Sequence, residues 1–333
     1  MFDNPDFNGL LVLPRIHVQN VNAISSPFTW GFPSMTAFLG LMWALERKLL
    51  REKPDLKDKM MLTSVGVVCH RFSPQVSDES YIRRFSLTRN PLDKDGKPSI
   101  LEEGKAHIVV SIVFGVNVLP DILISKAERD RLSYDVWETM MSMRIAGGSV
   151  IPGARFPILE VVPDDDDLEN RRMSFMKLRK RLLPGFALVS RESLLHEHFQ
   201  KMKKENPMAT LLDAWLDLSR NNIFAERKIS QTNEGIQESV EWTSSRKKGG
   251  GWVVPIPVGY TSLTEIFSGG SVSNTRDEKT SVRFVESAYS IGEWVGPHRL
   301  SDARDFLWHG HYDETIGVYR CVNNYQSKGD IDA

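Results

Sequence analysis

The sequence contains little cysteine and carries almost no net charge. Two cysteines, Cys69 and Cys321, lie far apart along its 333 residues, and 42 Lys and Arg residues are balanced by 43 Asp and Glu residues. Neither a disulfide framework nor a thiolate metal site can be built from two distant cysteines, which favours the reducing environment of the cytoplasm. The charge balance excludes a uniformly basic protein surface, so nucleic-acid binding would require a local groove.

Long apolar runs are also absent. The most apolar stretch, residues 107–124, is interrupted by Ser111, Asn117, Pro120 and Asp121 before it reaches the roughly 20 residues that a membrane-spanning helix needs. The N-terminal residues include two aspartates and no basic residue before the first apolar stretch, which is unlike a secretory signal. The sequence therefore predicts a cytoplasmic protein with no membrane association.

Motifs of nucleotide-binding and hydrolytic enzymes are missing. There is no Gly-x-x-x-x-Gly-Lys-Ser/Thr loop, no Gly-x-Gly-x-x-Gly fingerprint, no Gly-x-Ser-x-Gly elbow and no His-Glu-x-x-His pair. The histidine clusters at residues 196–198 and 309–313 lack the further ligands that a zinc or two-metal site requires. Cys69 and His70 are neighbours on an expected strand, so their side chains point to opposite faces and form a poor nucleophile and base pair. The sequence predicts no metal, no cofactor and no enzymatic activity.

Strand and helix patterns are interleaved along the chain, which predicts an α+β fold. Residues 10–21 alternate as a half-buried strand does, residues 35–51 form an amphipathic helix with Ser34 as its N-cap, and residues 106–118 give the strongest strand signal. Further strands are expected at 62–72, 183–189, 252–257, 283–285 and 291–295, helices at 125–144, 192–204, 207–224 and 301–309, and a polar linker at 225–250. No repeat of fixed period occurs, and length alone allows one elaborate domain or two modest ones.

Residues 73–104 differ in character from their surroundings. Polar and apolar side chains alternate over residues 82–89, and the segment 91–96 contains the proline and glycine of a turn. This pattern predicts an inserted β-hairpin with too little apolar surface for a core of its own, so we expect it to extend towards a partner. The basic residues of its alternating strand are Arg83, Arg84 and Arg89.

Side chains suited to single-stranded RNA occur at the ends of the expected strands. Arginine makes bidentate contacts with phosphates, guanidinium groups and aromatic rings stack on bases, asparagine reads base edges, and glycine lets a phosphate approach backbone amides. The candidate RNA-binding residues are Arg15, Asn20, Asn22, His70, Arg71, Arg89, Asn90, Arg144, Gly147, Gly148, Ser149, Arg283, His298 and Arg299. The aromatic residues Trp30, Phe32, Trp252 and Trp294 are expected in the core, which is their commoner place.

An ordered series of short sequence blocks, covering most of the chain, resembles a known family. The blocks are residues 13–15, 20–27, 30–33, 65–72 (VGVVCHRF), 87–92, 102–107, 143–149, 181–192, 251–257, 283–286 and 292–299. They resemble the Cas-five-type (Csy-two) subunits of the type I-F CRISPR surveillance complex, which belong to the repeat-associated, RRM-like (RAMP) superfamily. Segments 117–136, 154–170 and 223–250 depart from the pattern of that family.

The resemblance implies a non-catalytic subunit that forms a single RAMP-type domain over residues 1–333. Its RRM-like, ferredoxin-like head would hold the 5′ handle of the CRISPR RNA. It implies pairing with the large subunit of the complex, and contact with the first backbone (Csy-three-type) subunit through a thumb-like element. Residues 73–104 are the candidate thumb, and the helical segment 190–228 is a candidate docking surface for a partner. Target double-stranded DNA would be engaged through the assembled complex.

A metal-independent endoribonuclease is the alternative, because relatives on this fold in other CRISPR subtypes cleave precursor RNA. A histidine such as His70 or His298 would serve as general base or acid, since the ordinary histidine pKa of about 6.5 suits either role. The subtype that this sequence resembles assigns cleavage to a separate subunit. The resemblance therefore favours the non-catalytic role.

Overall fold

The computed structural model describes residues 5–77, 82–89, 96, 100–151, 155–163, 167–232, 235–246, 251–275 and 277–326. The helices are α1 Met35–Glu52, α2 Pro120–Ile124, α3 Lys126–Met141, α4 Leu168–Arg181, α5 Glu192–Glu205 and α6 Leu211–Ser219, with the 3-10 turns η1 Pro54–Leu56, η2 Pro297–Arg299 and η3 Ala303–Asp305. The strands are β1 Gly9–Asn22, β2 Ile24–Ser26, β3 Thr29–Trp30, β4 Met60–Pro74, β5 Val76–Ser77, β6 Arg84–Phe85, β7 Leu87–Arg89, β8 Ile100–Glu102, β9 Lys105–Val118, β10 Arg144–Ile145, β11 Gly148–Ile151, β12 Ile158–Val161, β13 Phe186–Ser190, β14 Ile223–Thr232, β15 Gly235–Ser244, β16 Trp252–Ser262, β17 Val285–Val295, β18 His309–Asp313 and β19 Val318–Val322. This mixture confirms the α+β class. Among these elements, no helix combines the length and apolar character needed to cross a membrane.

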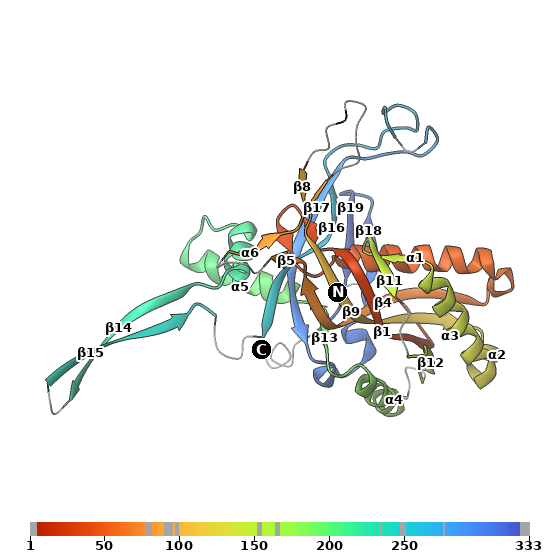
Figure 1. Cartoon of the computed structure of the whole chain (residues 1–333), viewed down its shortest axis with the longest axis horizontal. Coiled ribbons are helices and arrows are strands. Elements are labelled where there is room, and N and C mark those ends of the chain that lie inside the picture. Colours follow the sequence, from red (N-terminus) through yellow and green to blue (C-terminus); the bar gives the residue numbers. More distant parts are fainter. Residues whose placement is uncertain are drawn as a thin grey trace.

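One curled antiparallel sheet forms the centre of the molecule (Figure 1). Its strand order is β10-β11-β1-β9-β4-β13-β17-β16-β19-β18, and β12 pairs with the beginning of β1. β9 lies between β1 and β4 over nearly its whole length, and most of its residues are buried. A nearly continuous apolar run is expected for a strand covered on both faces, which explains why residues 106–118 gave the strongest strand signal.

The first part of the chain positions one half of this sheet. β1, α1, β4, β9, α3 and β11 follow one another in the order β-α-β-β-α-β, and their strands lie side by side as β11-β1-β9-β4. This arrangement is compatible with the expected ferredoxin-like head. α1 begins as predicted, because the Ser34 side chain accepts a hydrogen bond from the backbone N–H of Thr36. Its apolar side, which includes Phe38 and Leu45, packs in the same core cluster as Leu13 of β1 and Val110 of β9.

β13 joins the two halves of the sheet, since it pairs with Val68 and Cys69 of β4 on one side and with β17 on the other. Trp308 strengthens this junction. Its backbone pairs with that of Val65 in β4, and its indole Nε1 donates a 2.9 Å hydrogen bond to the carbonyl of Leu188 in β13. The prediction of a helix over residues 301–309 is therefore wrong: only the turn η3, capped by Asp302, forms there, and the chain is then extended to pair with β4.

Several strands pair outside the main sheet. The described parts of residues 73–104, where a hairpin was predicted, form short ladders of β5 with β6 and of β7 with β8. β14 and β15 form a longer ribbon that extends away from the body of the molecule (Figure 1), where a polar linker at 225–250 was expected. That expectation is wrong because a two-stranded ribbon outside the core does not require the alternation that identifies a half-buried strand.

Two predicted helices are shorter than expected. The helix expected at residues 125–144 ends in α3 before Arg144, which lies in β10 instead. The helix expected at 207–224 begins only after Thr210, whose side chain forms a capping box with Asp213. A capping box satisfies the free N–H groups of the first helical turn, so it sets the start of α6 in place of the earlier proline.

Candidate nucleic-acid interface

One face of the sheet is open to solvent at the end of β1 and the facing parts of β9 and β4, beyond the stretch that is covered on both sides. Val18 of β1 is buried in the core cluster that contains α1, whereas His17 and Gln19 point to the opposite face and are exposed. Arg71 of β4 and His107 of β9 are exposed beside them. These side chains form a polar groove of about 260 Å³ that is lined by His17, Val18, Gln19, Arg71, Ser73, His107, Ile108, Val109 and Ile151.

β-Bulges place three of the predicted RNA-binding residues along this face. The register between β1 and β9 shifts around Arg15 and again around Asn20, and the register between β4 and β9 shifts at His70. Arg15 and Asn20 have left-handed backbone conformations, with φ of 49° and 60°. Such conformations are uncommon for residues with side chains, and bulges redirect side chains next to functional sites. The three bulges therefore mark this face as the candidate site.

His70 and Arg15 share a hydrogen-bond network around Ser111 of β9. The Ser111 hydroxyl lies 2.7 Å from Nε2 of His70 and accepts a 3.0 Å hydrogen bond from the backbone N–H of Arg15. Nδ1 of His70 lies 2.5 Å from the carbonyl oxygen of Pro184, and Nη2 of Arg15 donates to the carbonyl of Leu183 at 2.9 Å. The network thus fixes the loop between α4 and β13 against the open face.

Several arginines give this face a positive potential. Burial lowers the pKa of His70, and the charges of Arg15 and Arg155 lower it further, against the opposing effect of the Pro184 carbonyl. Burial and the charge of Arg155 also lower the pKa of Arg15. Within the described part of the chain, no carboxylate lies within 4.0 Å of the charged groups of Arg15, Arg71 or Arg155. Positive charge without a protein counter-ion suits a phosphate backbone.

Asn20 is held at the rim of the polar groove by two neighbours. Its side-chain oxygen accepts a hydrogen bond from Nε2 of Gln75, and its backbone N–H donates to Nδ1 of His107 at 3.4 Å. Nε2 of Gln75 also lies 3.1 Å from Nε2 of His107. This group of amide and imidazole side chains offers both donors and acceptors, which is what reading a base edge requires.

The turn between β10 and β11 lies against the end of β1. Its central residues, Ala146 and Gly147, have φ of 47° and 78°, as two-residue hairpin turns do. The Ala146 carbonyl accepts a 2.9 Å hydrogen bond from the backbone N–H of Asn22. A Cβ atom at Gly148 would lie 2.6 Å from the carbonyl oxygen of Gln19, so this close approach requires glycine. The pairing therefore makes neighbours of Asn20, Asn22, Arg144, Gly147, Gly148 and Ser149.

The structure places other predicted residues away from this group. Arg283 contacts Glu265 at 3.8 Å and the hydroxyl of Tyr312 at 3.4 Å, on the opposite half of the sheet. His298 and Arg299 lie in η2, where the His298 carbonyl accepts a hydrogen bond from the side chain of α4 residue Arg179, and Arg299 pairs with a buried glutamate at 3.8 Å. Of Arg89 only the backbone in β7 is described, and Asn90 lies outside the described residues.

Several residues of the open face were not among the predicted RNA-binding residues. Arg155 lies in a segment that departs from the family pattern, so no matched block drew attention to it. His107 and Ser111 alternate with buried residues of β9, and this period of two was the available signal. Gln75 follows directly on β4 and carried no signal beyond its polarity.

The thiol of Cys69 is unsuited to nucleophilic chemistry. It is half-buried, where a core position was expected, and burial raises its pKa to about 12. A thiol with so high a pKa is almost entirely protonated at neutral pH and reacts slowly. No three His, Cys, Asp or Glu side chains come together to hold a metal ion anywhere in the part of the chain that the structure describes.

Buried histidines predict a loss of stability on mild acidification. His309 is 8% exposed, and burial, with a smaller effect of His311, lowers its pKa. As the pH falls below the ordinary histidine value of about 6.5, the unfolded chain therefore takes up protons before the folded chain does, and unfolding becomes easier. His70 acts in the same direction. We expect the thermal midpoint to fall by a few degrees between pH 7.5 and 6.0, and His309→Gln to flatten this dependence. An unchanged slope in that variant would contradict the assignment.

The fold and the site together define an α+β protein with an open, arginine-bearing sheet face. A family model described as CRISPR-associated protein (Cas_Csy2) matches residues 11–321. A relative, the CRISPR-associated protein Csy2 of Pseudomonas aeruginosa (strain UCBPP-PA14), is 43% identical over 322 residues, which make up 95% of either chain. The chain belongs to the Csy2 family of CRISPR-associated proteins. The family resemblance of the sequence blocks is thereby confirmed.

Proposed function

We propose that this protein is the subunit of a type I-F CRISPR surveillance complex that holds the 5′ handle of the CRISPR RNA. The observation that carries the proposal is the alignment of the bulged residues Arg15, Asn20 and His70 on one open sheet face. Arginines there contact phosphates, while Asn20 and its neighbours read base edges of the unpaired handle. Membership of the Csy2 family supports the CRISPR context.

We propose that two parts of the molecule contact the partner subunits, the hairpin at residues 73–104 and the helical segment 190–228. We assign the thumb role, with contact to the first backbone subunit, to the hairpin at residues 73–104, because its described strands β5 to β8 pair only with one another, outside the main sheet. We assign the contact with the large subunit to the helical segment 190–228. α6 buries Trp215 against the sheet but leaves Leu212 and Leu216 62% and 49% exposed, and such an apolar surface suits a protein partner. The subunit engages target double-stranded DNA only through this assembly.

The proposal is tested by mixing the purified chain with repeat RNA in the presence of EDTA. We expect the RNA to be bound and to stay intact, and an unrelated RNA of equal length to bind more weakly. The contacts of His70 favour intact RNA. Both of its ring nitrogens are within hydrogen-bond distance of protein oxygens, so neither is free to act as a general base or acid on the RNA. A defined cleavage product that disappears in His70→Ala or His298→Ala would establish the endoribonuclease instead.

A further inference from the structure

An aromatic pocket opens at the junction between the two halves of the sheet. Its volume is about 450 Å³, which lies within the range of pockets that bind small organic groups. We define this aromatic pocket by its ring-bearing residues, Trp30, Phe32, Phe72, Phe186, Trp252 and Trp294. It borders the polar groove, because Arg71 lines both, but its ring-bearing lining offers a different chemistry.

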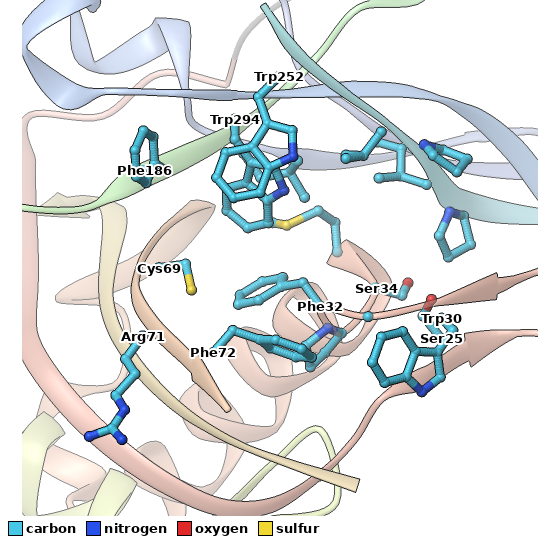
Figure 2. Close-up of a pocket in the computed structure, with 18 of the residues that line it drawn as sticks. Ser25, Trp30, Phe32, Ser34, Cys69, Arg71, Phe72, Phe186, Trp252 and Trp294 are labelled. Carbon is cyan, nitrogen blue, oxygen red and sulfur yellow. The ribbon is translucent and has the colours of Figure 1, made fainter. Parts of the chain in front are cut away.

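The rings stand on two facing walls (Figure 2). Trp252 of β16 and Trp294 of β17 form one wall, with ring centroids 6.2 Å apart, and Phe32, Phe72 and Trp30 form the other. Trp30 meets Phe72 edge to face at 6.1 Å. The two walls meet where Phe32 contacts Trp294 edge to face at 5.0 Å, and they are open beyond it at Trp30 and Trp252. Edge-to-face and tilted contacts leave ring faces uncovered by another ring, so a further flat group has faces on which to stack there.

The aromatic side chains at the mouth of the pocket are unusually exposed to solvent for their size. Trp30, Trp252 and Phe186 are 46%, 54% and 46% exposed. Trp30 and Trp252 were expected in the core, and this exposure corrects that prediction. Clustered open rings in a cavity indicate a ligand that covers them, because a folded protein otherwise gains by burying such surface.

The surroundings of the pocket favour a nucleic acid over an apolar peptide. Arg71 lines both the aromatic pocket and the polar groove, and Figure 2 shows its guanidinium group directed away from the rings. The lining of the pocket includes Arg71 and His70 but no aspartate or glutamate. A cation at the mouth beside exposed aromatic rings matches a base joined to a phosphate.

We propose that the aromatic pocket receives one unpaired nucleobase of the bound RNA, stacked on Trp252 and Trp30, while Arg71 holds an adjoining phosphate. This inference rests on the proposed function, because the base belongs to the RNA strand that runs along the polar groove. The candidate thumb contacts a wall of this pocket, since the ring of Phe85 in β6 lies 5.5 Å from that of Trp30. A base that stacks on Trp30 would therefore lie next to the contact with the hairpin at residues 73–104.

The test uses the full chain and handle RNA in which 2-aminopurine replaces each base in turn. We expect one position to lose its fluorescence strongly on binding, because stacking on indole quenches the analogue. Removal of the base at that position should weaken binding by roughly 5- to 150-fold, the range for one stacked base. Trp252→Ala should cause a similar loss, and the abasic RNA should lose little more in that variant. Trp242→Ala, which removes a 69% exposed tryptophan from the distant ribbon of β14 and β15, is the matched control.

The outcomes separate the pocket from the proposed function. RNA that binds with full affinity to Trp252→Ala and Trp30→Ala, with no quenched position, would overturn the pocket and leave the proposed function intact. Unchanged RNA affinity together with loss of a co-purifying subunit would make the pocket a protein-docking site, which also overturns it. Absence of specific RNA binding by the native chain would overturn both. The abasic RNA measurement needs only the native protein, so it decides the matter even where a tryptophan variant fails to fold.

Discussion

Replacing Arg71, Arg144 and Arg155 together by glutamine should weaken handle RNA binding on the order of a hundredfold or more. All three side chains are exposed: Arg71 lines the polar groove, Arg144 lies in β10 at the edge of the same sheet, and the charge of Arg155 acts on His70 and Arg15. A hydrogen bond to a charged group is worth about 1.5–3 kcal/mol, and about 1.4 kcal/mol corresponds to a tenfold change in affinity. The dependence on salt should also become shallower. Each phosphate contact to a single strand contributes about 0.7 to the slope of log affinity against log salt, so the slope should fall by about 2.

The matched control removes three positive charges from the opposite layer of the molecule. Arg47 and Arg51 are exposed on α1, and the Arg131 side chain is exposed on α3. The triple replacement of these residues by glutamine changes the net charge equally and should leave most of the affinity and the salt slope unchanged. Equal losses in the two triple variants, measured by fluorescence titration at several salt concentrations, would contradict a local binding groove.

Replacing Glu293 by alanine should destabilise the folded chain by about 3–5 kcal/mol. Glu293 is 2% exposed and accepts a 2.7 Å hydrogen bond from Nη1 of Arg191, which is itself 9% exposed. Nη1 of Arg299 lies 3.8 Å from its other carboxylate oxygen. Removing one partner of a buried ion pair leaves an uncompensated charge in the interior, and this is the source of the large effect.

The midpoint of chemical or thermal unfolding measures this change. Glu265→Ala is the control, because the Glu265 carboxylate is fully exposed and its 3.8 Å pair with Arg283 should contribute little. Replacing both Arg191 and Glu293 by apolar residues of similar volume should recover much of the loss, since it removes both charges. A Glu293→Ala chain that unfolds like the native one would show that the pair is solvated.

Periodicity was sufficient to predict the central strands and the first helix. β9 is buried along most of its length and α1 has one apolar side, so both patterns are strong, and Ser34 marks where α1 begins. The ribbon of β14 and β15 was missed because neither of its strands takes part in the core. The segment before His309 was misassigned because the backbone pairing of Trp308 with β4 is a long-range contact that leaves no local signal.

Chemistry predicted part of the candidate site, and geometry supplied the rest. Arg15, Asn20 and His70 were chosen as side chains suited to RNA, but the bulges that align them depend on pairing with β9 and cannot be read from one strand. Trp252 was expected in the core because large aromatic residues are usually buried there. The opening beside it depends on how β13 separates β4 from β17, which is a property of the whole sheet.

The most direct test of the proposed function is purification of the tagged protein from its native host, with sequencing of the RNA ends and identification of the proteins that accompany it. The account predicts uniform short RNAs that share one 5′ segment, together with a large subunit and a repeated backbone subunit. Recovery of the protein without such RNA and without those partners would contradict it.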